Sequence, residues 1–115
     1  MLHEAVNTSL IPVKMCASTV EIDQFAPDWT LAQLEEGELD EPRIFVRNIQ
    51  FDTPFSNIPL VHVGLAGFDI DNRDTARISV HSEAITSAAF NLVIRTWRNT
   101  CIYKVEISWI ALGQA

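Results

Sequence analysis

Residues 89–111 decide the fold class; they read Ala-Phe-Asn-Leu-Val-Ile-Arg-Thr-Trp-Arg-Asn-Thr-Cys-Ile-Tyr-Lys-Val-Glu-Ile-Ser-Trp-Ile-Ala. On both sides of a polar turn at residues 98–100, apolar side chains occupy every second position. A period of two is typical of a half-buried strand, because successive side chains of a strand point to opposite faces. The stretch therefore predicts two strands, residues 89–97 and 102–111, separated by a turn.

The same alternation recurs toward the amino terminus. The further strands that it predicts are residues 43–51, 60–68 and 77–84, with a polar turn over residues 69–75. Val20-Glu21-Ile22 is a candidate for a sixth strand, and residues 30–36 are a candidate helical turn. Six closely spaced strands in a short chain indicate an all-β fold, an antiparallel sandwich.

The phase of each strand predicts which side chains form the core. The predicted core includes Val61, Val63, Leu65, Ile78, Val80, Phe90, Leu92, Ile94, Tyr103, Val105, Ile107 and Trp109. The opposite phase carries small and mixed polar residues, namely His62, Gly64, Ala66, Ser79 and His81. We interpret these five residues as one surface, which packs against a second copy of the chain or under a loop from the first forty residues.

The length of 115 residues fits one domain with one core. Within it, residues 1–42 lack a strong period and end in a run of acids, Glu35, Glu36, Glu38, Asp40 and Glu41. We expect residues 1–42 to form an arm and acidic loop that packs on the sandwich or on a neighbouring subunit. Residues 43–115 are the predicted sandwich.

Charge and motifs exclude several function classes. The net charge of −7 argues against nucleic acid and anionic membranes, which bind cation-rich surfaces. The sequence has no long apolar run for membrane insertion, and no phosphate loop, nucleophile elbow or zinc-helix motif. We therefore predict a protein that is not an enzyme and that needs no cofactor or metal.

The amino terminus and the cysteines bear on the cellular compartment. Residues 1–17 do not resemble a signal peptide, because acidic and polar residues interrupt the apolar ones. We expect a protein that is cytoplasmic or released by a non-classical route. Cys16 and Cys101 are far apart in sequence, and two separate thiols are the favoured interpretation over a disulfide.

A series of short motifs adds a family resemblance. In chain order they are Asn48-Ile-Gln-Phe51, Pro54-Phe55, Pro59-Leu-Val61, Arg77-Ile-Ser-Val80, Phe90, Thr96-Trp97-Arg98-Asn99-Thr100, Ile102-Tyr103 and Ile107-Ser-Trp-Ile-Ala111. This order resembles the H-type lectin domain of snail agglutinins and of the carboxy-terminal half of slime-mould discoidins. The resemblance covers residues 43–111.

The resemblance implies a six-stranded antiparallel β-sandwich, an H-type lectin-like fold that assembles into trimers or hexamers. It further implies metal-free binding of galactose or N-acetylgalactosamine in a groove between subunits. The positions that match the family's sugar-binding groups are Glu38, Asp40, Arg77, Trp97, Arg98 and Tyr103. Arg98 stands where snail proteins have His, and Glu38 stands where they have Gly. The family's paired cysteines fall on Ser56 and Ile94, so that disulfide is absent here.

These residue types suit a sugar on chemical grounds. A carboxylate such as Asp40 accepts hydrogen bonds from neighbouring hydroxyls, and a guanidinium such as Arg77 donates a rigid fork. An aromatic ring such as Trp97 covers the C–H face of a pyranose. The structural alternatives are an acidic run in solvent and an Arg77 ion pair with Asp69, Asp71 or Asp74.

The three remaining site candidates also have structural alternatives. Trp97 could cap the end of the sandwich, and Arg98 could be a solvated turn residue. Tyr103 alternates with core residues, so its ring could belong to the core with the hydroxyl directed at the groove.

Two functions follow for the sequence. The first is a lectin for glycans with terminal galactose or N-acetylgalactosamine, as in cell adhesion, with sites at the subunit interfaces of a trimer or hexamer. The alternative is a non-enzymatic structural, assembly or adhesion protein that uses the same sandwich with a degenerate sugar site.

Overall fold

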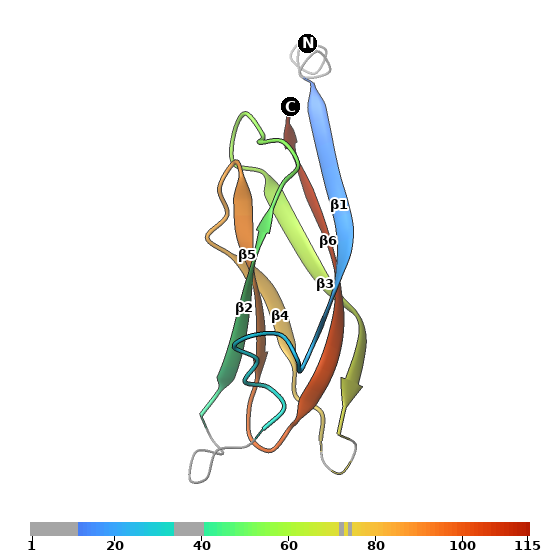
Figure 1. Cartoon of the computed structure of the whole chain (residues 1–115). Coiled ribbons are helices and arrows are strands. Elements are labelled where there is room, and N and C mark those ends of the chain that lie inside the picture. The colour runs from blue at the N-terminus through green and yellow to red at the C-terminus, as the bar shows by residue number, and fades with distance from the viewer. Residues whose placement is uncertain (1–11, 34–40, 72, 74) are drawn as a thin grey trace, which may run out of the picture.

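The computed structural model describes residues 12–33, 41–71, 73 and 75–115, and these residues form six strands (Figure 1). The strands are β1 (Val13–Asp23), β2 (Arg43–Gln50), β3 (Leu60–Ile70), β4 (Ser79–Glu83), β5 (Ala89–Thr96) and β6 (Ile102–Gln114). The described residues include no helix that is long and apolar enough to cross a membrane.

The strands form two three-stranded sheets, ordered β1-β6-β3 and β2-β5-β4, in which every pair is antiparallel. Figure 1 shows the two sheets face to face, as in a β-sandwich. The consecutive strands β5 and β6 belong to different sheets, so the turn between them crosses from one layer to the other. The predicted all-β, six-stranded antiparallel sandwich is therefore confirmed.

The core lies between the sheets and follows the predicted phases except at the start of β6, where Ile102 is buried and Tyr103, which was predicted in the core, is only half-buried. Phe90, Leu92 and Ile94 of β5 and Val105 and Ile107 of β6 are fully buried. Four aromatic rings extend this core, with centroids 5.0–5.9 Å apart, and they belong to Phe51, Phe55, Phe90 and Trp109. Aromatic contacts at these spacings add about 0.5–1.5 kcal/mol per pair beyond burial.

The sixth strand is β1, which contains the predicted Val20-Glu21-Ile22 and begins seven residues earlier, at Val13. The inward phase of its first half is hard to recognise because it contains Lys14. The Lys14 ammonium donates to the Thr53 and Pro54 carbonyls at 2.5 and 2.9 Å and lies over the Phe55 ring. A satisfied cation can thus occupy an inward position.

Two local predictions need comment. Residues 30–33 of the candidate helical turn form no helix, and residues 34–36 lie outside the described part of the chain. Cys16 and Cys101 are both free. Cys16 lies opposite Ala111 in the pairing of β1 with β6. Ala111 is ten residues from Cys101 (111 − 101), and ten residues of extended chain span about 33 Å, so the two cysteines are far apart. The prediction of two separate thiols is confirmed.

The predicted single packing surface is wrong. His62, Gly64 and Ala66 lie on β3, in the β1-β6-β3 sheet, whereas Ser79 and His81 lie on β4, in the other sheet. These residues therefore belong to two outer faces on opposite sides of the sandwich. Alternation reveals the phase within a strand, but it does not reveal which sheet the strand joins.

Candidate functional site

Three connections gather at one end of the sandwich, which we call the loop end (Figure 1). They are the described residues 24–33 after β1, residues 71, 73 and 75–78 between β3 and β4, and residues 97–101 between β5 and β6. Arg77, Trp97 and Arg98 lie in these connections, and Tyr103 lies at the start of β6. The other two predicted site residues, Glu38 and Asp40, lie outside the described residues.

Arg77 is held by the turn that follows β5. Its backbone N–H donates to Thr100 Oγ1 at 3.2 Å, and its carbonyl accepts from Thr96 Oγ1. In its side chain, Nη1 donates to Asn99 Oδ1 at 3.1 Å and more weakly to Thr75 O and Thr100 Oγ1. Nη2 and Nε make no hydrogen bond to the described residues, and Asp74, one of the acids that the sequence offers as a partner for Arg77, lies outside them.

Trp97 lines a shallow hollow of about 300 Å³ together with Pro42, Ser79 and Arg95. We call this the Trp97 hollow. Two lining residues are close in sequence to predicted sugar ligands. Pro42 follows Asp40 by two residues, and Ser79 follows Arg77 by two residues. Arg95 pairs directly with Ser79 across the sheet. The hollow therefore opens on the outer face of the β2-β5-β4 sheet.

A second hollow, of about 410 Å³, lies on the other side of the first residues of β2 and shares Pro42 with the first. We call it the Trp29 hollow. Its lining residues are Trp29, Thr30, Gln33, Glu41, Pro42, Arg43 and Ile44. Gln33 and Glu41 are the described residues that flank the stretch with Asp40 and Glu38.

Arg43 joins the connections that form both hollows. Its Nη1 donates to the carbonyls of Leu31 and Gln33 at 3.2 and 2.9 Å, before β2. Its Nη2 donates to the carbonyls of Arg98 and Thr100 at 2.8 and 2.6 Å, after β5. Burial lowers the pKa of the Arg43 guanidinium, but an arginine keeps its proton at neutral pH. One side chain thus fixes two connections relative to each other.

Arg98 has a left-handed backbone, with φ of 57°, and an exposed side chain. In this conformation its carbonyl accepts from Arg43. Left-handed φ values are uncommon for residues other than glycine, so the bond offsets part of the conformational cost. Arg98 therefore has a structural role in the turn through its backbone, whatever its side chain binds.

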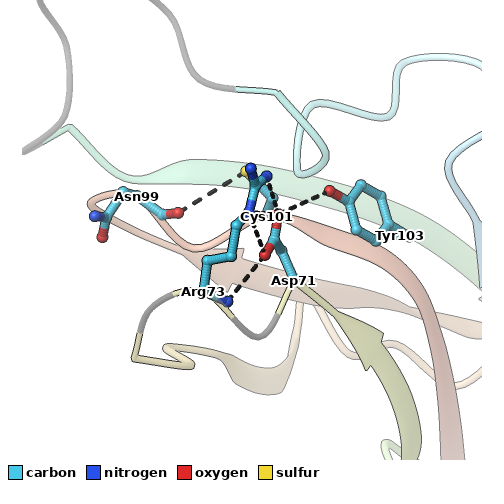
Figure 2. Close-up of polar contacts among 5 residues, drawn as sticks. All are labelled: Asp71, Arg73, Asn99, Cys101 and Tyr103. Carbon is cyan, nitrogen blue, oxygen red and sulfur yellow. Dashed lines mark hydrogen bonds and ion pairs between the residues drawn. The ribbon is translucent and has the colours of Figure 1, made fainter.

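Tyr103 contacts a different cluster, which Figure 2 shows. Its hydroxyl donates to Asp71 Oδ2 at 3.3 Å, and Asp71 is also paired with Arg73. Asp71, which the sequence offered as a partner for Arg77, thus binds Arg73 and Tyr103. The side-chain bonds from Arg73 hold the pKa of Asp71 well below its usual range, and burial raises the pKa of Tyr103. The Tyr103 ring is half-buried and does not line the Trp97 hollow.

We expect the Asp71 cluster to make the free energy of unfolding depend on pH at acid pH. Because the folded-state pKa of Asp71 is depressed, its contribution is complete above the unfolded pKa of about 3.9 and is lost as pH falls below it. We expect Asp71→Asn to lower the unfolding free energy equally at pH 7 and pH 5, and by less at pH 3. Urea titrations at the three pH values measure this difference. A difference that grows toward acid pH would contradict it.

Sequence reasoning missed Arg43, Arg95 and Pro42 as residues that shape the site. One signal was present, because Arg43 occupies the same phase of β2 as the buried Phe45. A charged residue in an inward phase needs polar partners, so it points to carbonyl groups at that end of the core. The described residues contain no group of three His, Cys, Asp or Glu side chains that could hold a metal ion.

Comparisons with known proteins agree with this fold. The family model for the H-type lectin domain matches residues 46–112, which is more than half of the chain. The chain is 36% identical over 72 residues to "ATP synthase subunits region ORF 7" of Fuscovulum blasticum, covering 63% of each protein. It is 30% identical over 71 residues to Discoidin-2 of Dictyostelium discoideum, covering 61% of this chain and 28% of that protein. The chain thus spans less than two thirds of the length of both relatives.

Solved structures give the same result. The native structure of recombinant discoidin II from Dictyostelium discoideum matches with a TM-score of 0.70 and 26% identity, over 90% of this chain and 38% of that chain. The wild-type discoidin II structure matches with a TM-score of 0.71, over 90% of this chain and 37% of that chain. The chain belongs to the H-type lectin domain family.

Proposed function

We propose that this chain is a lectin that binds sugars of the galactose and N-acetylgalactosamine type at the loop end of the sandwich. The observation that carries the proposal is the bond from Arg77 Nη1 to Asn99 Oδ1, which ties the Arg77 side chain to the same short connection as Trp97, a lining residue of the Trp97 hollow. The family is one of carbohydrate-binding domains, so binding without catalysis is the proposed activity.

The proposed sugar contacts include both hydrogen-bond donors and hydrogen-bond acceptors. Arg77 donates to ring or acetamido oxygens, and Asp40 accepts from two neighbouring hydroxyls. Hydrogen bonds with one charged partner are roughly twice as strong as neutral ones. Trp97 packs against the C–H face of the sugar, and Arg98 and the backbone at Glu38 add polar contacts. Tyr103 acts through Asp71, which it helps to position.

A single hollow of this kind holds few sugar atoms, so affinity at one site is expected to be weak. Repeating the site in a homo-oligomer raises avidity by roughly 10²–10⁴ when the target sugars can reach several sites together. The proposed ligands are therefore glycans that present several terminal galactose or N-acetylgalactosamine units. The proposed assembly is a trimer or a hexamer.

The seam between copies is proposed to lie on the outer face of the β2-β5-β4 sheet, beside the Trp97 hollow. The row Val46, Val93 and His81 crosses the middle of this face; Val93 is buried, and the exposed apolar residues are Val46 at 50% and Ile44 at 47%. His81 Nε2 lies 3.0 Å from Glu83 Oε1, so the two polar side chains beside the row bind each other. An apolar centre with polar neighbours that are hydrogen-bonded favours self-association.

The seam makes a testable prediction. Val46→Arg places one charge per copy in the middle of the proposed interface, so we expect the particle mass to fall from an oligomer to a monomer. Met15→Arg, on the outer face of the other sheet and 64% exposed, is the matched control and should leave the mass unchanged. Light scattering coupled to gel filtration measures both. If Met15→Arg dissociates the protein and Val46→Arg does not, the seam lies on the other face.

A glycan array tests the proposed function directly. The wild-type protein should bind glycans that end in galactose or N-acetylgalactosamine and should ignore those that end in glucose or mannose. Equal binding to all neutral sugars would contradict the proposed specificity. The absence of binding to any glycan would contradict the lectin proposal itself.

One observation favours a second function, that of an assembly or adhesion protein with a degenerate sugar site. Met15, Leu112 and Leu60 form a row across all three strands of the β1-β6-β3 sheet, and they are 64%, 44% and 73% exposed. Such a row is typical of a surface that another protein covers. A protein that binds no glycan on the array, but loses an assembly when Met15 becomes Arg, would fit this function instead.

A further inference from the structure

We propose that the Trp29 hollow is a second sugar subsite, so that the ligand is an uncharged oligosaccharide of at least two units. This inference rests on the proposed function, since it extends the same binding site. The observation behind it is that two hollows, rather than one, meet at Pro42. A chain of sugars that fills the Trp97 hollow would reach the Trp29 hollow by passing over the first residues of β2.

The two hollows are placed to hold one continuous ligand. The Trp97 hollow lies over β5 and β4, and the Trp29 hollow lies along the free edge of β2. Thr30 Oγ1 donates to the Ile44 carbonyl at 3.1 Å, which holds the segment after β1 against that edge. At about 410 and 300 Å³, each hollow falls at the low end of the range for ligand pockets.

The lining of the Trp29 hollow has the chemistry that a pyranose requires. Gln33 and Glu41 are exposed, and they offer an amide, which donates and accepts, and a carboxylate, which accepts. The Trp29 ring and Ile44, which is 47% exposed, supply an apolar wall. The indole nitrogen already donates to the Ile102 carbonyl at 2.9 Å, and the ring packs on Phe45. The ring is therefore fixed in place before a ligand arrives.

The backbone of the subsite is also fixed in advance. Arg43 donates to the Leu31 and Gln33 carbonyls, so the chain that carries the Gln33 amide is tied to the sheet. A site that is ordered before binding loses less conformational entropy when the ligand arrives. This ordering favours binding of the second sugar in the Trp29 hollow.

Charge selects the class of oligosaccharide. Glu41 lines the hollow, in a chain of net charge −7. A carboxylate or sulfate on the second sugar would face the like charge of the Glu41 carboxylate, whereas hydroxyl and acetamido groups would add no like charge. The proposed ligand is therefore neutral at the unit that follows the terminal sugar.

Titration calorimetry on the full chain tests the subsite with three probes. They are methyl galactoside, a neutral trisaccharide with terminal galactose, and the same trisaccharide with a sulfate on its second unit. We expect the neutral trisaccharide to bind about tenfold more tightly than methyl galactoside, and the sulfated one no more tightly than methyl galactoside. Gln33→Ala should reduce the tenfold gain to less than about threefold.

Gln50→Ala is the matched control, because Gln50 is an exposed glutamine at the far end of β2 and should leave all affinities unchanged. Methyl galactoside and the neutral trisaccharide binding equally well to the wild type would overturn the subsite while leaving the proposed function intact. A Gln33→Ala variant that weakens both ligands by the same factor would also overturn it. Binding of none of the probes would overturn both proposals.

Discussion

Arg77→Ala is expected to weaken galactoside binding by roughly 100-fold or more. Two guanidinium nitrogens are proposed to bind the sugar, and hydrogen bonds from a charged donor contribute about 1.5–3 kcal/mol each. Arg77→Lys should restore only a small part of the affinity, because an ammonium group cannot present the two-pronged donor geometry of a guanidinium. Calorimetry with methyl galactoside, or competition on an immobilised glycan, measures both variants.

The fold should survive the Arg77→Ala change. The backbone bonds of Arg77 with the Thr100 and Thr96 hydroxyls do not depend on its side chain, so the attachment of residue 77 to the end of β5 and the turn after it remains. Thermal unfolding followed by circular dichroism checks that the variant is folded. An Arg77→Ala protein that is folded and binds galactosides like the wild type would show that the site lies elsewhere.

Asp40→Ala tests the acceptor side of the same site and should lower affinity by a similar factor. Glu36→Ala is its matched control, because it removes one charge from the same acidic run without removing the proposed ligand. If both residues bind the same sugar, their effects should not add, and the affinity of the double variant Asp40→Ala/Arg77→Ala should be only slightly lower than that of either single variant. Equal loss in Glu36→Ala and Asp40→Ala would indicate a general charge effect instead.

The sequence predicted the strands well where one face is uniformly apolar. In β5 and β6 the inward residues Phe90, Leu92, Val105 and Ile107 are all fully buried, and the alternation was clear. It was weaker in β1 and β2, where Lys14 and Arg43 hold inward positions because backbone carbonyls satisfy their charges. The period-two pattern is recognised from the hydrophobicity of the inward residues. A cation at an inward position interrupts that pattern even where backbone carbonyls bind it in the folded protein.

The site was predictable only in part. The family resemblance brought Arg77, Trp97 and Arg98 to attention, and the structure brings these three residues to one end of the sandwich. Pairing between strands far apart in sequence decides which residues share a hollow, and a single sequence carries no record of that pairing. That Pro42, Ser79 and Trp97 line one hollow is therefore evident only from the structure.

Arg43→Met is expected to lower the free energy of unfolding by about 3 kcal/mol, with a fall of roughly 10 °C in melting temperature. The reason is that four carbonyls lose a charged donor, and the buried residues Leu31 and Thr100 have little water near their carbonyls to replace it. This loss is a large part of the 5–15 kcal/mol typical of a domain. Urea unfolding measures the change.

The control for Arg43→Met lies on the same face of the same strand. The Arg47 guanidinium carbon lies 5.8 Å from the centre of the Phe45 ring, a cation–π contact of about 0.5–1 kcal/mol, so Arg47→Met should cost less than about 1 kcal/mol. Arg43→Met should also weaken methyl galactoside and trisaccharide binding together, because Arg43 ties the connections around both hollows. Equal destabilisation by the two variants would mean that lost apolar packing, rather than the four carbonyl bonds, explains the role of Arg43.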